Sequence, residues 1–335
     1  MAADLRADLV LEGGGVRGLG AAGAVIGLLE EGYTFPRAAG TSVGAIAAAF
    51  VAAGVGAEEL RDIMGRLDLA RVRDRVPPRL PVLSEGVSLF GRRGAYRGEW
   101  IRQWLEKELA ELGVTTFRDL RYDDPGADTD LPEDKRYKLV VMATDVTHGR
   151  LLRLPWDYRL YGLDPDEQKV ADAVRCSLSI PFYFHPCELT HPTTGEKSVI
   201  VDGGILSNFA VDTFDRTDGK QPRWPTFGVR ILPELPAGIT ELFPALAVAM
   251  SPLLQLLQQV VATTLVGRDQ TYLEQPGVRD RMISVSCGEV GITDFGLGPE
   301  AREALAEAGR RAAAEFLRRF HGGSTVMERR GGSSI

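Results

Sequence analysis

The stretch "LVLEGGGVRGLGAAGAVIGLLEEG", residues 9–32, decides how the chain begins to fold. Its first three residues, Leu9 to Leu11, form with the preceding Asp8 a short and largely apolar run, as expected for a buried strand. Gly13, Gly15 and Gly18 follow in the spacing G-x-G-x-x-G, and apolar residues at helical spacing continue to Gly32. The stretch therefore predicts a strand, a tight glycine turn and a helix, whose N-terminus gathers backbone N–H groups into a place for an anion.

A second glycine motif distinguishes two interpretations of that turn, dinucleotide binding and acyl transfer. A dinucleotide-binding fold needs an acid at the end of the second strand, to hold the ribose. Here the second strand, near residues 37–39, ends in Gly40-Thr41-Ser42-Val43-Gly44, a G-x-S-x-G. Glycines on both sides of a serine allow the sharp strand-to-helix turn that exposes its hydroxyl. The sequence thus favours acyl transfer by Ser42, with a dinucleotide-binding oxidoreductase as the second class of function.

A serine nucleophile needs a base, and Asp202 is the best candidate. It ends the predicted strand "SVIVDGG", residues 198–204, where Gly203 and Gly204 leave room for a close approach. A carboxylate with an ordinary pKa of about 3.9 is a weak base. Asp202 would therefore act only in a poorly hydrated pocket, against the serine hydroxyl. The four histidines lie in no strong motif: His148, His185, His191 and His321, the last at the edge of the C-terminal tail.

The motifs "EGGGVRG", "GTSVG" and "VDGG", in this order, resemble those of the patatin-like phospholipase family. "SLSIPFYFHP" (177–186) and "GAYRGEWIRQWL" (94–105) also resemble family segments. The resemblance implies Ser42 as nucleophile and Asp202 as general base, in place of a His-Asp pair. It implies an oxyanion hole built from Gly13, Gly14 and Gly15, with Arg17 beside it. The other motif glycines are Gly18, Gly40, Gly44, Gly203 and Gly204.

The activity that this resemblance implies is hydrolysis of fatty-acyl esters of phospholipids or lysophospholipids, with no metal and no cofactor. A third class remains open, a lipid-binding or regulatory protein that keeps the fold without turnover. We expect the acyl chain among residues 242–266 and around Trp100 and Trp104. Residues 242–266 carry no charge and could span a bilayer. Gln255, Gln258 and Gln259 would be costly among lipid tails, so a buried or lip-forming helix pair is favoured.

Alternating strands and helices predict an α/β fold with a largely parallel sheet. The resemblance implies a three-layer sandwich around that sheet. We expect a catalytic domain over residues 7–290 with an insertion at about 55–135, a C-terminal helix within 291–320 that packs on it, and a flexible tail over 321–335.

Composition limits the compartment and the partners. The 335 residues are 44% hydrophobic and 25% charged, which is typical of a soluble globular protein. Three widely separated cysteines fit a reducing compartment, and no signal peptide is seen, so we expect a cytoplasmic protein. The net charge of −7 argues against nucleic acid as a partner.

Positive charge nevertheless gathers in one segment. Residues 61–102 hold ten arginines against five acids, which makes peripheral contact with an anionic membrane surface an expectation. The alternative is an ordinary solvated face, in which these arginines pair with nearby acids: Asp62, Asp68, Asp74 and Glu85.

Overall fold

The structure is a computed structural model. It describes residues 5–74, 94–122, 132–216, 218–231, 260–261, 263–264, 276–288, 290–292 and 294–331. The expected acyl-binding segment 242–266 lies almost wholly outside the described residues, as does the Pro-rich part of the expected insertion.

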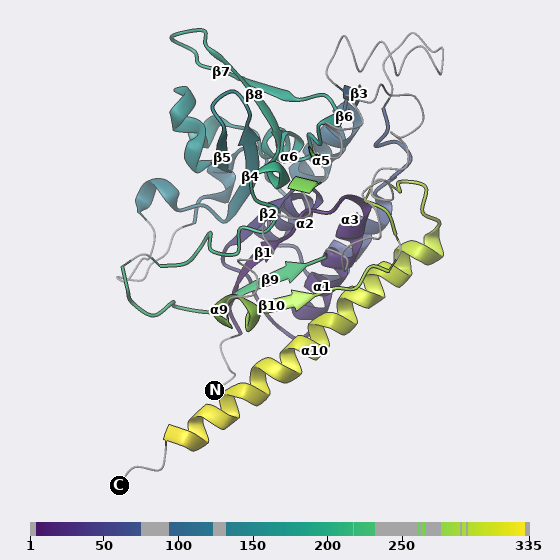
Figure 1. The fold of residues 1–335 in the computed structure, drawn as a ribbon, viewed down its shortest axis with the longest axis vertical. Coiled ribbons are helices and arrows are strands. Elements are labelled where there is room, and N and C mark those ends of the chain that lie inside the picture. The colour runs from purple at the N-terminus through teal and green to yellow at the C-terminus, as the bar shows by residue number, and fades with distance from the viewer. Residues whose placement is uncertain are drawn as a thin grey trace.

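An eight-stranded sheet forms the centre of the fold (Figure 1). Its parallel part runs in the order β10 (Met282–Ser284), β9 (Thr226–Arg230), β1 (Asp8–Leu11), β2 (Ala38–Thr41) and β4 (Leu139–Asp145). The wholly buried runs of β1, β2 and β4 fit strands that are covered on both faces.

The rest of the sheet is antiparallel. β5 (Arg150–Leu154) and β8 (Lys197–Asp202) both pair with β4 in the antiparallel sense, and β7 (Cys187–Thr190) pairs with β8. A separate parallel pair is formed by β3 (Gly94–Tyr96) and β6 (Phe182–Phe184). The expected largely parallel sheet is confirmed, with this antiparallel part added.

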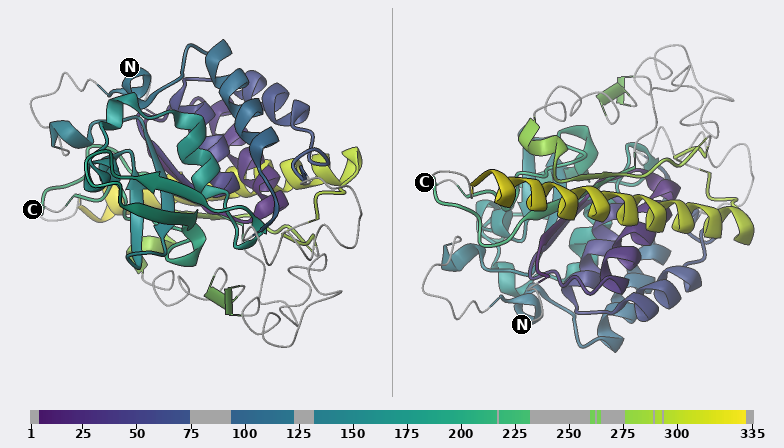
Figure 2. Two further views of the ribbon diagram at one scale, coloured as in Figure 1. Left: turned by 90° about the horizontal axis from the view of Figure 1, so that it is seen from above. Right: turned by 90° about the horizontal axis from the view of Figure 1, so that it is seen from below.

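Each face of the sheet has its own core. Leu9 and Leu11 of β1 point into the larger core, whereas Val10 points into the smaller one. Six helices supply the larger core: α1 (Gly18–Glu30), α2 (Val43–Ala52), α3 (Ala57–Arg66), α5 (Glu99–Glu111), α6 (Val170–Ser177) and α10 (Pro299–Gly331). Residues 209–214 and α9 (Pro276–Arg279) cover the smaller core. The fold is thus the expected three-layer α/β sandwich (Figure 2).

The long helix α10 lies along α1, as Figure 1 shows. We expected this helix to end near residue 320 and a flexible tail to follow, but its helical backbone continues to Gly331. Residues 321–331 contain no proline that would stop the helix. Each residue added to an existing helix forms one further hydrogen bond, so the helix can continue beyond residue 320. No helix within the described ranges is long and apolar enough to cross a membrane.

Candidate active site

Ser42 occupies the turn between β2 and α2. Its backbone has φ 53° and ψ −127°, and the residue is 3% exposed. Positive φ is strained for a residue with a side chain, and such strain persists only where the surroundings fix it. A Cβ at Gly40 would lie 2.5 Å from the Gly44 carbonyl oxygen, and one at Gly44 would lie 2.6 Å from the Glu12 carbonyl oxygen. Both motif glycines are therefore required by close backbone contacts around the serine.

The pairing of β4 brings Asp202 to Ser42. Because β5 pairs with residues 141–145 of β4, β2 and β8 must share the opposite edge of β4. β2 runs parallel to β4 and ends with Thr41 opposite Met142. β8 runs the other way and ends with Asp202 opposite Ala143. The two strands meet end to end, so that Ser42 follows the end of one and Asp202 forms the end of the other.

The Asp202 carboxylate is held in a dry position. The residue is 1% exposed, and its Oδ1 accepts a hydrogen bond of 2.8 Å from the Gly204 N–H. Burial raises the pKa of Asp202 to about 7, although the Gly204 N–H and the nearby Ser42 hydroxyl both act to lower it. Its Oδ2 accepts no hydrogen bond of good geometry from the residues that the structure describes. The carboxylate therefore keeps one oxygen available for a proton.

The glycine turn lies directly against the serine. A Cβ at Gly13 would lie 3.1 Å from the Ser42 Cβ and 2.4 Å from Asn208 Oδ1. The Gly13 N–H already donates to the Asn208 carbonyl oxygen at 3.2 Å, and the Asn208 side chain donates Nδ2–H to the Gly13 carbonyl oxygen at 2.8 Å. Among the described residues, no backbone carbonyl accepts from the N–H of Gly14 or Gly15. These two amides, rather than that of Gly13, are thus the candidate oxyanion donors.

Arg17 and Glu12 flank the glycine turn, and the side chains of both form hydrogen bonds with backbone groups near it. Arg17 is 4% exposed, its Nε donates to the Val290 carbonyl oxygen, and burial lowers its pKa. Arg17 lines neither of the two cavities around Ser42 that are described below. Because it is buried, it is also not part of an ordinary surface ion pair. Glu12, fully buried, accepts the Ile231 N–H on Oε2 at 2.6 Å, which ties the turn to the end of β9.

Two adjoining cavities meet at Ser42. The smaller one is lined by both predicted catalytic residues and by the glycine turn; its lining is Gly13, Gly14, Gly15, Ser42, Ile180, Asp202, Asn208 and Ile292. The other is almost entirely apolar; its lining includes Leu19, Val43, Ile46, Leu67, Leu69, Val72, Ile101, Leu178, Phe184 and Phe295. Gly15, Ser42 and Ile180 belong to both linings. The cavity that holds Ser42 and Asp202 thus adjoins an apolar pocket.

The apolar pocket is not lined by the tryptophans that we expected. Trp100 stacks on Trp104 with ring centroids 6.5 Å apart, and Trp104 meets the edge of Phe50. These rings pack against the larger core, and from the same helix it is Ile101 that reaches the pocket. The helix α5 presents Ile101, rather than either tryptophan, to this pocket, and the position of the acyl chain stays a prediction.

The four histidines line neither cavity. His148 bonds to Asp145 at 2.7 Å, and His321 lies 3.4 Å from the Tyr33 hydroxyl. Within the described ranges, no three His, Cys, Asp or Glu side chains cluster in a way that could hold a metal ion.

Sequence reasoning missed several residues of the site. Asn208 lies six positions after Asp202, in the loop that follows the "VDGG" motif, and this proximity was the one available signal. Ile180, Ile292 and Phe295 come from segments whose contribution depends on tertiary packing.

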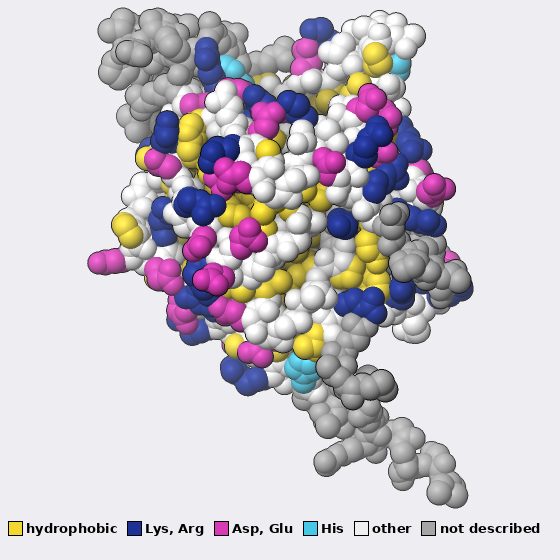
Figure 3. All heavy atoms as spheres, turned by 180° about the vertical axis from the view of Figure 1, so that it is seen from behind, with side chains coloured by type: hydrophobic (Ala, Val, Ile, Leu, Met, Phe, Trp, Pro, Cys, Tyr) yellow, Lys and Arg dark blue, Asp and Glu magenta, His cyan; other side chains and the backbone are white. Residues whose placement is uncertain are grey.

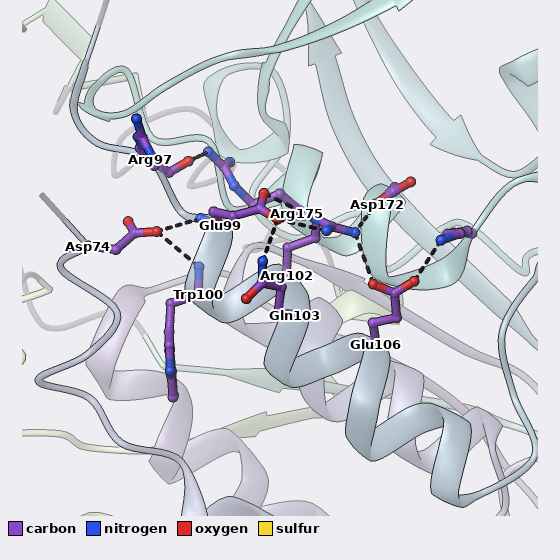
Figure 4. Close-up of polar contacts among 10 residues, drawn as sticks. Asp74, Arg97, Glu99, Trp100, Arg102, Gln103, Glu106, Asp172 and Arg175 are labelled. Carbon is purple, nitrogen blue, oxygen red and sulfur yellow. Dashed lines mark hydrogen bonds and ion pairs between the residues drawn. The ribbon is translucent and has the colours of Figure 1, made fainter. Parts of the chain in front are cut away.

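Three described arginines of residues 61–102 form ion pairs with acids other than those we had considered. Arg61 pairs with Glu30, and Arg66 pairs with Glu108 at 2.7 Å. Arg102 pairs with Glu99 at 2.7 Å, as Figure 4 shows. Asp68 and Asp74 instead accept hydrogen bonds from backbone N–H groups. Figure 3 shows basic and acidic side chains interspersed over the face it displays.

Comparison with known proteins identifies the family of this chain. The family model described as patatin-like phospholipase matches residues 9–215. The uncharacterized protein YqhO of Bacillus subtilis (strain 168) is 33% identical over 321 residues, which cover 93% of this chain and 98% of YqhO. The chain therefore belongs to the patatin-like phospholipase family, as its motifs predicted, and the family supports a lipid ester hydrolase.

Solved structures share the fold at low identity. VipD from Legionella pneumophila matches with a TM-score of 0.50 and 17% identity, over 94% of this chain and 67% of VipD. A chain of the heterodimeric ExoU–SpcU complex from Pseudomonas aeruginosa matches with a TM-score of 0.51 and 18% identity, over 95% of this chain. This chain spans about half, 52%, of that second chain.

Proposed function

We propose that the protein is a serine lipid acyl hydrolase that cleaves fatty-acyl esters of phospholipids or lysophospholipids through Ser42 and Asp202. The observation that carries the proposal is the juxtaposition of the strained Ser42 turn with a buried carboxylate whose pKa is raised to about 7. A base with a pKa near the working pH is the most effective proton acceptor for a hydroxyl nucleophile.

In the first half of the proposed reaction, Ser42 Oγ attacks the ester carbonyl carbon while its proton passes to Asp202. Negative charge develops on the carbonyl oxygen, where the N–H groups of Gly14 and Gly15 and the N-terminus of α2 would stabilise it. The C–O bond to the alcohol then breaks, and the departing alcohol takes the proton from Asp202. The acyl group stays on Ser42 as an ester, with its chain in the apolar pocket.

In the second half, water attacks this ester and gives its proton to Asp202. The tetrahedral intermediate expels Ser42 Oγ, which recovers the proton, and the fatty acid leaves. The apolar pocket beside Ser42 favours a substrate with a hydrocarbon chain over a small polar ester, because burying each CH₂ group contributes about 0.8 kcal/mol. The dinucleotide alternative lacks support, because β2 leads directly to Ser42 and not to a ribose-binding acid.

The decisive experiment measures fatty-acid release from phospholipids, lysophospholipids and p-nitrophenyl esters by wild type and by Ser42→Ala. We expect loss of about 10⁴-fold or more in kcat, because the alanine side chain cannot form the acyl-enzyme. Ser198→Ala, which removes another buried serine hydroxyl that lines neither cavity, is the matched control. Equal rates for wild type and Ser42→Ala would exclude this mechanism, and lipid binding without turnover would favour a non-catalytic lipid-binding protein.

A further inference from the structure

The C-terminal end of α6 contacts both Ser42 and Asp202 through their main-chain amides. Ser177, the last residue of α6, accepts a hydrogen bond on Oγ from the Ser42 N–H at 2.8 Å. Two residues later, the Ser179 carbonyl oxygen accepts the Asp202 N–H at 3.0 Å. One short segment thus sets the position of both predicted catalytic residues.

The Ser177 hydroxyl is itself held in a single orientation. The residue is fully buried, and its Oγ donates to the Met142 carbonyl oxygen at 2.5 Å. A hydroxyl has only one proton, so the bond to Met142 leaves a lone pair for the Ser42 N–H. Met142 is the β4 residue that pairs with Thr41, next to Ser42. Ser177 therefore connects the serine turn to the strand along which β2 and β8 meet.

The segment that carries Ser177 is anchored from the other side by Arg175. Its Nη1 donates to Ser179 Oγ at 2.7 Å, and its Nη2 donates to the carbonyl oxygens of Arg97 and His185. Figure 4 shows Arg175 directed toward Arg97, at the start of the chain segment that leads into α5. The end of α6 is thus fixed to the β3–β6 region as well as to the sheet.

We infer that Ser177 is a positioning residue for Ser42. The φ of 53° at Ser42 is unfavourable by itself, and the hydrogen bond from the Ser42 N–H to the Ser177 hydroxyl stabilises this backbone conformation. Without this acceptor, the buried Ser42 N–H loses its partner, and the turn rotates to find another. That rotation carries Ser42 Oγ away from Asp202. The effect on rate rests on the proposed function, whereas the effect on the Ser42 backbone does not.

The test compares Ser177→Ala with Ser198→Ala, because both remove a buried serine hydroxyl and Ser198 lies outside the site. With a p-nitrophenyl ester as probe, we expect Ser177→Ala to lower kcat by about 10- to 100-fold, because a displacement of about 1 Å at the reacting atom has effects of this size. KM should change by less than about twofold, because the apolar pocket is intact. Ser198→Ala should keep the wild-type kcat.

Crystal structures of wild type and Ser177→Ala provide a readout that does not depend on turnover. We expect Ser42 to leave its positive-φ conformation in the variant and its Oγ to move away from Asp202. An unchanged Ser42 backbone, or a kcat no lower than that of Ser198→Ala, would overturn the inference. If the alanine variant does not fold, Ser177→Cys carries the same test, because a thiol of similar size accepts hydrogen bonds only weakly. Failure of the proposed function would appear separately, as an unchanged rate in Ser42→Ala.

Discussion

At the scale of single residues, the decisive quantity is the pKa of Asp202. Burial raises it to about 7, so the carboxylate is mostly protonated below neutral pH and mostly ionised above it. Only the ionised form can accept the Ser42 proton. We therefore expect kcat/KM to rise with pH through about 7 and then to level off, measured from about pH 5 to about pH 9. Activity that stays flat down to about pH 5 would show a base of ordinary carboxylate pKa.

The same raised pKa predicts a stability effect of known sign. A carboxyl whose pKa is higher in the folded than in the unfolded state stabilises the fold at low pH, and this contribution is lost as pH rises through about 7. Asp202→Asn removes that loss. We expect the variant to gain up to about 4 kcal/mol over wild type at about pH 8.5 and little at about pH 4, at about 1.4 kcal/mol per pKa unit. Denaturant unfolding at both pH values measures it, and an equal difference at both would contradict it.

The sequence identified Ser42 and Asp202 because their motifs fix local turns, and the structure places the two residues together. Their catalytic roles stay predictions. The sequence did not show that Arg17 faces Val290 rather than the reaction cavity, because a side chain's direction depends on packing. Nor did it show the pKa of Asp202, which results from burial by residues distant in the chain.

The histidines provide a separate test of the mechanism. We expect His185→Ala and His321→Ala to retain most activity, and a large loss in either would revive a Ser-His-Asp triad.

At the scale of elements, the site depends on two strands that share one edge of β4. The sequence predicted that residues 198–204 form a strand ending in Asp202, and β8 (Lys197–Asp202) confirms it. The sequence predicted a largely parallel sheet, but β8 is antiparallel to β4. A buried strand has the same apolar pattern in either direction, so only the pairing could reveal how Asp202 reaches Ser42.

The glycine turn offers a prediction at this scale, through Asn208. Its Nδ2–H bond to the Gly13 carbonyl oxygen fixes the plane of the Gly13–Gly14 peptide and so the direction of the Gly14 N–H. We expect Asn208→Ala to lower kcat by up to about 10²-fold, the usual effect of losing one oxyanion donor, with a smaller change in KM. Steady-state kinetics with the p-nitrophenyl ester measures it, with the neighbouring Ser207→Ala as control. A loss confined to KM would instead assign Asn208 to substrate binding.

At the scale of the whole molecule, the sandwich holds its form while the sequence varies widely. The solved relatives share the fold at 17% and 18% identity. Apolar runs next to glycine turns sufficed to predict β1, β2, β8 and the helix α1. The strands β3, β5, β6 and β7 were not predicted, because each is stabilised by a pairing partner that only the folded chain supplies.

Charge distribution supplies the last prediction, association with membranes. The chain carries −7 overall, yet residues 61–102 hold ten arginines against five acids. Arg61, Arg66 and Arg102 pair with glutamates, and such pairing reduces their contribution at a lipid surface. Each basic side chain that does reach an anionic surface contributes about 1 kcal/mol. We therefore expect tighter binding to anionic than to zwitterionic vesicles, with a difference in binding free energy that corresponds to contact by a few arginines.

The measurement is vesicle co-sedimentation at about 0.05 M and about 1 M salt, because the Debye length shrinks to about 3 Å at the higher concentration. Replacing Arg92 and Arg93 together by serine should weaken binding to anionic vesicles at low salt. Replacing Arg318 and Arg319 of α10 by serine removes the same charge outside the segment and serves as the matched control. If both pairs weaken binding equally, net charge alone governs association. If neither vesicle type is preferred at either salt concentration, the arginines of residues 61–102 form an ordinary solvated face, because a membrane contact made through their charge must respond to both lipid charge and salt.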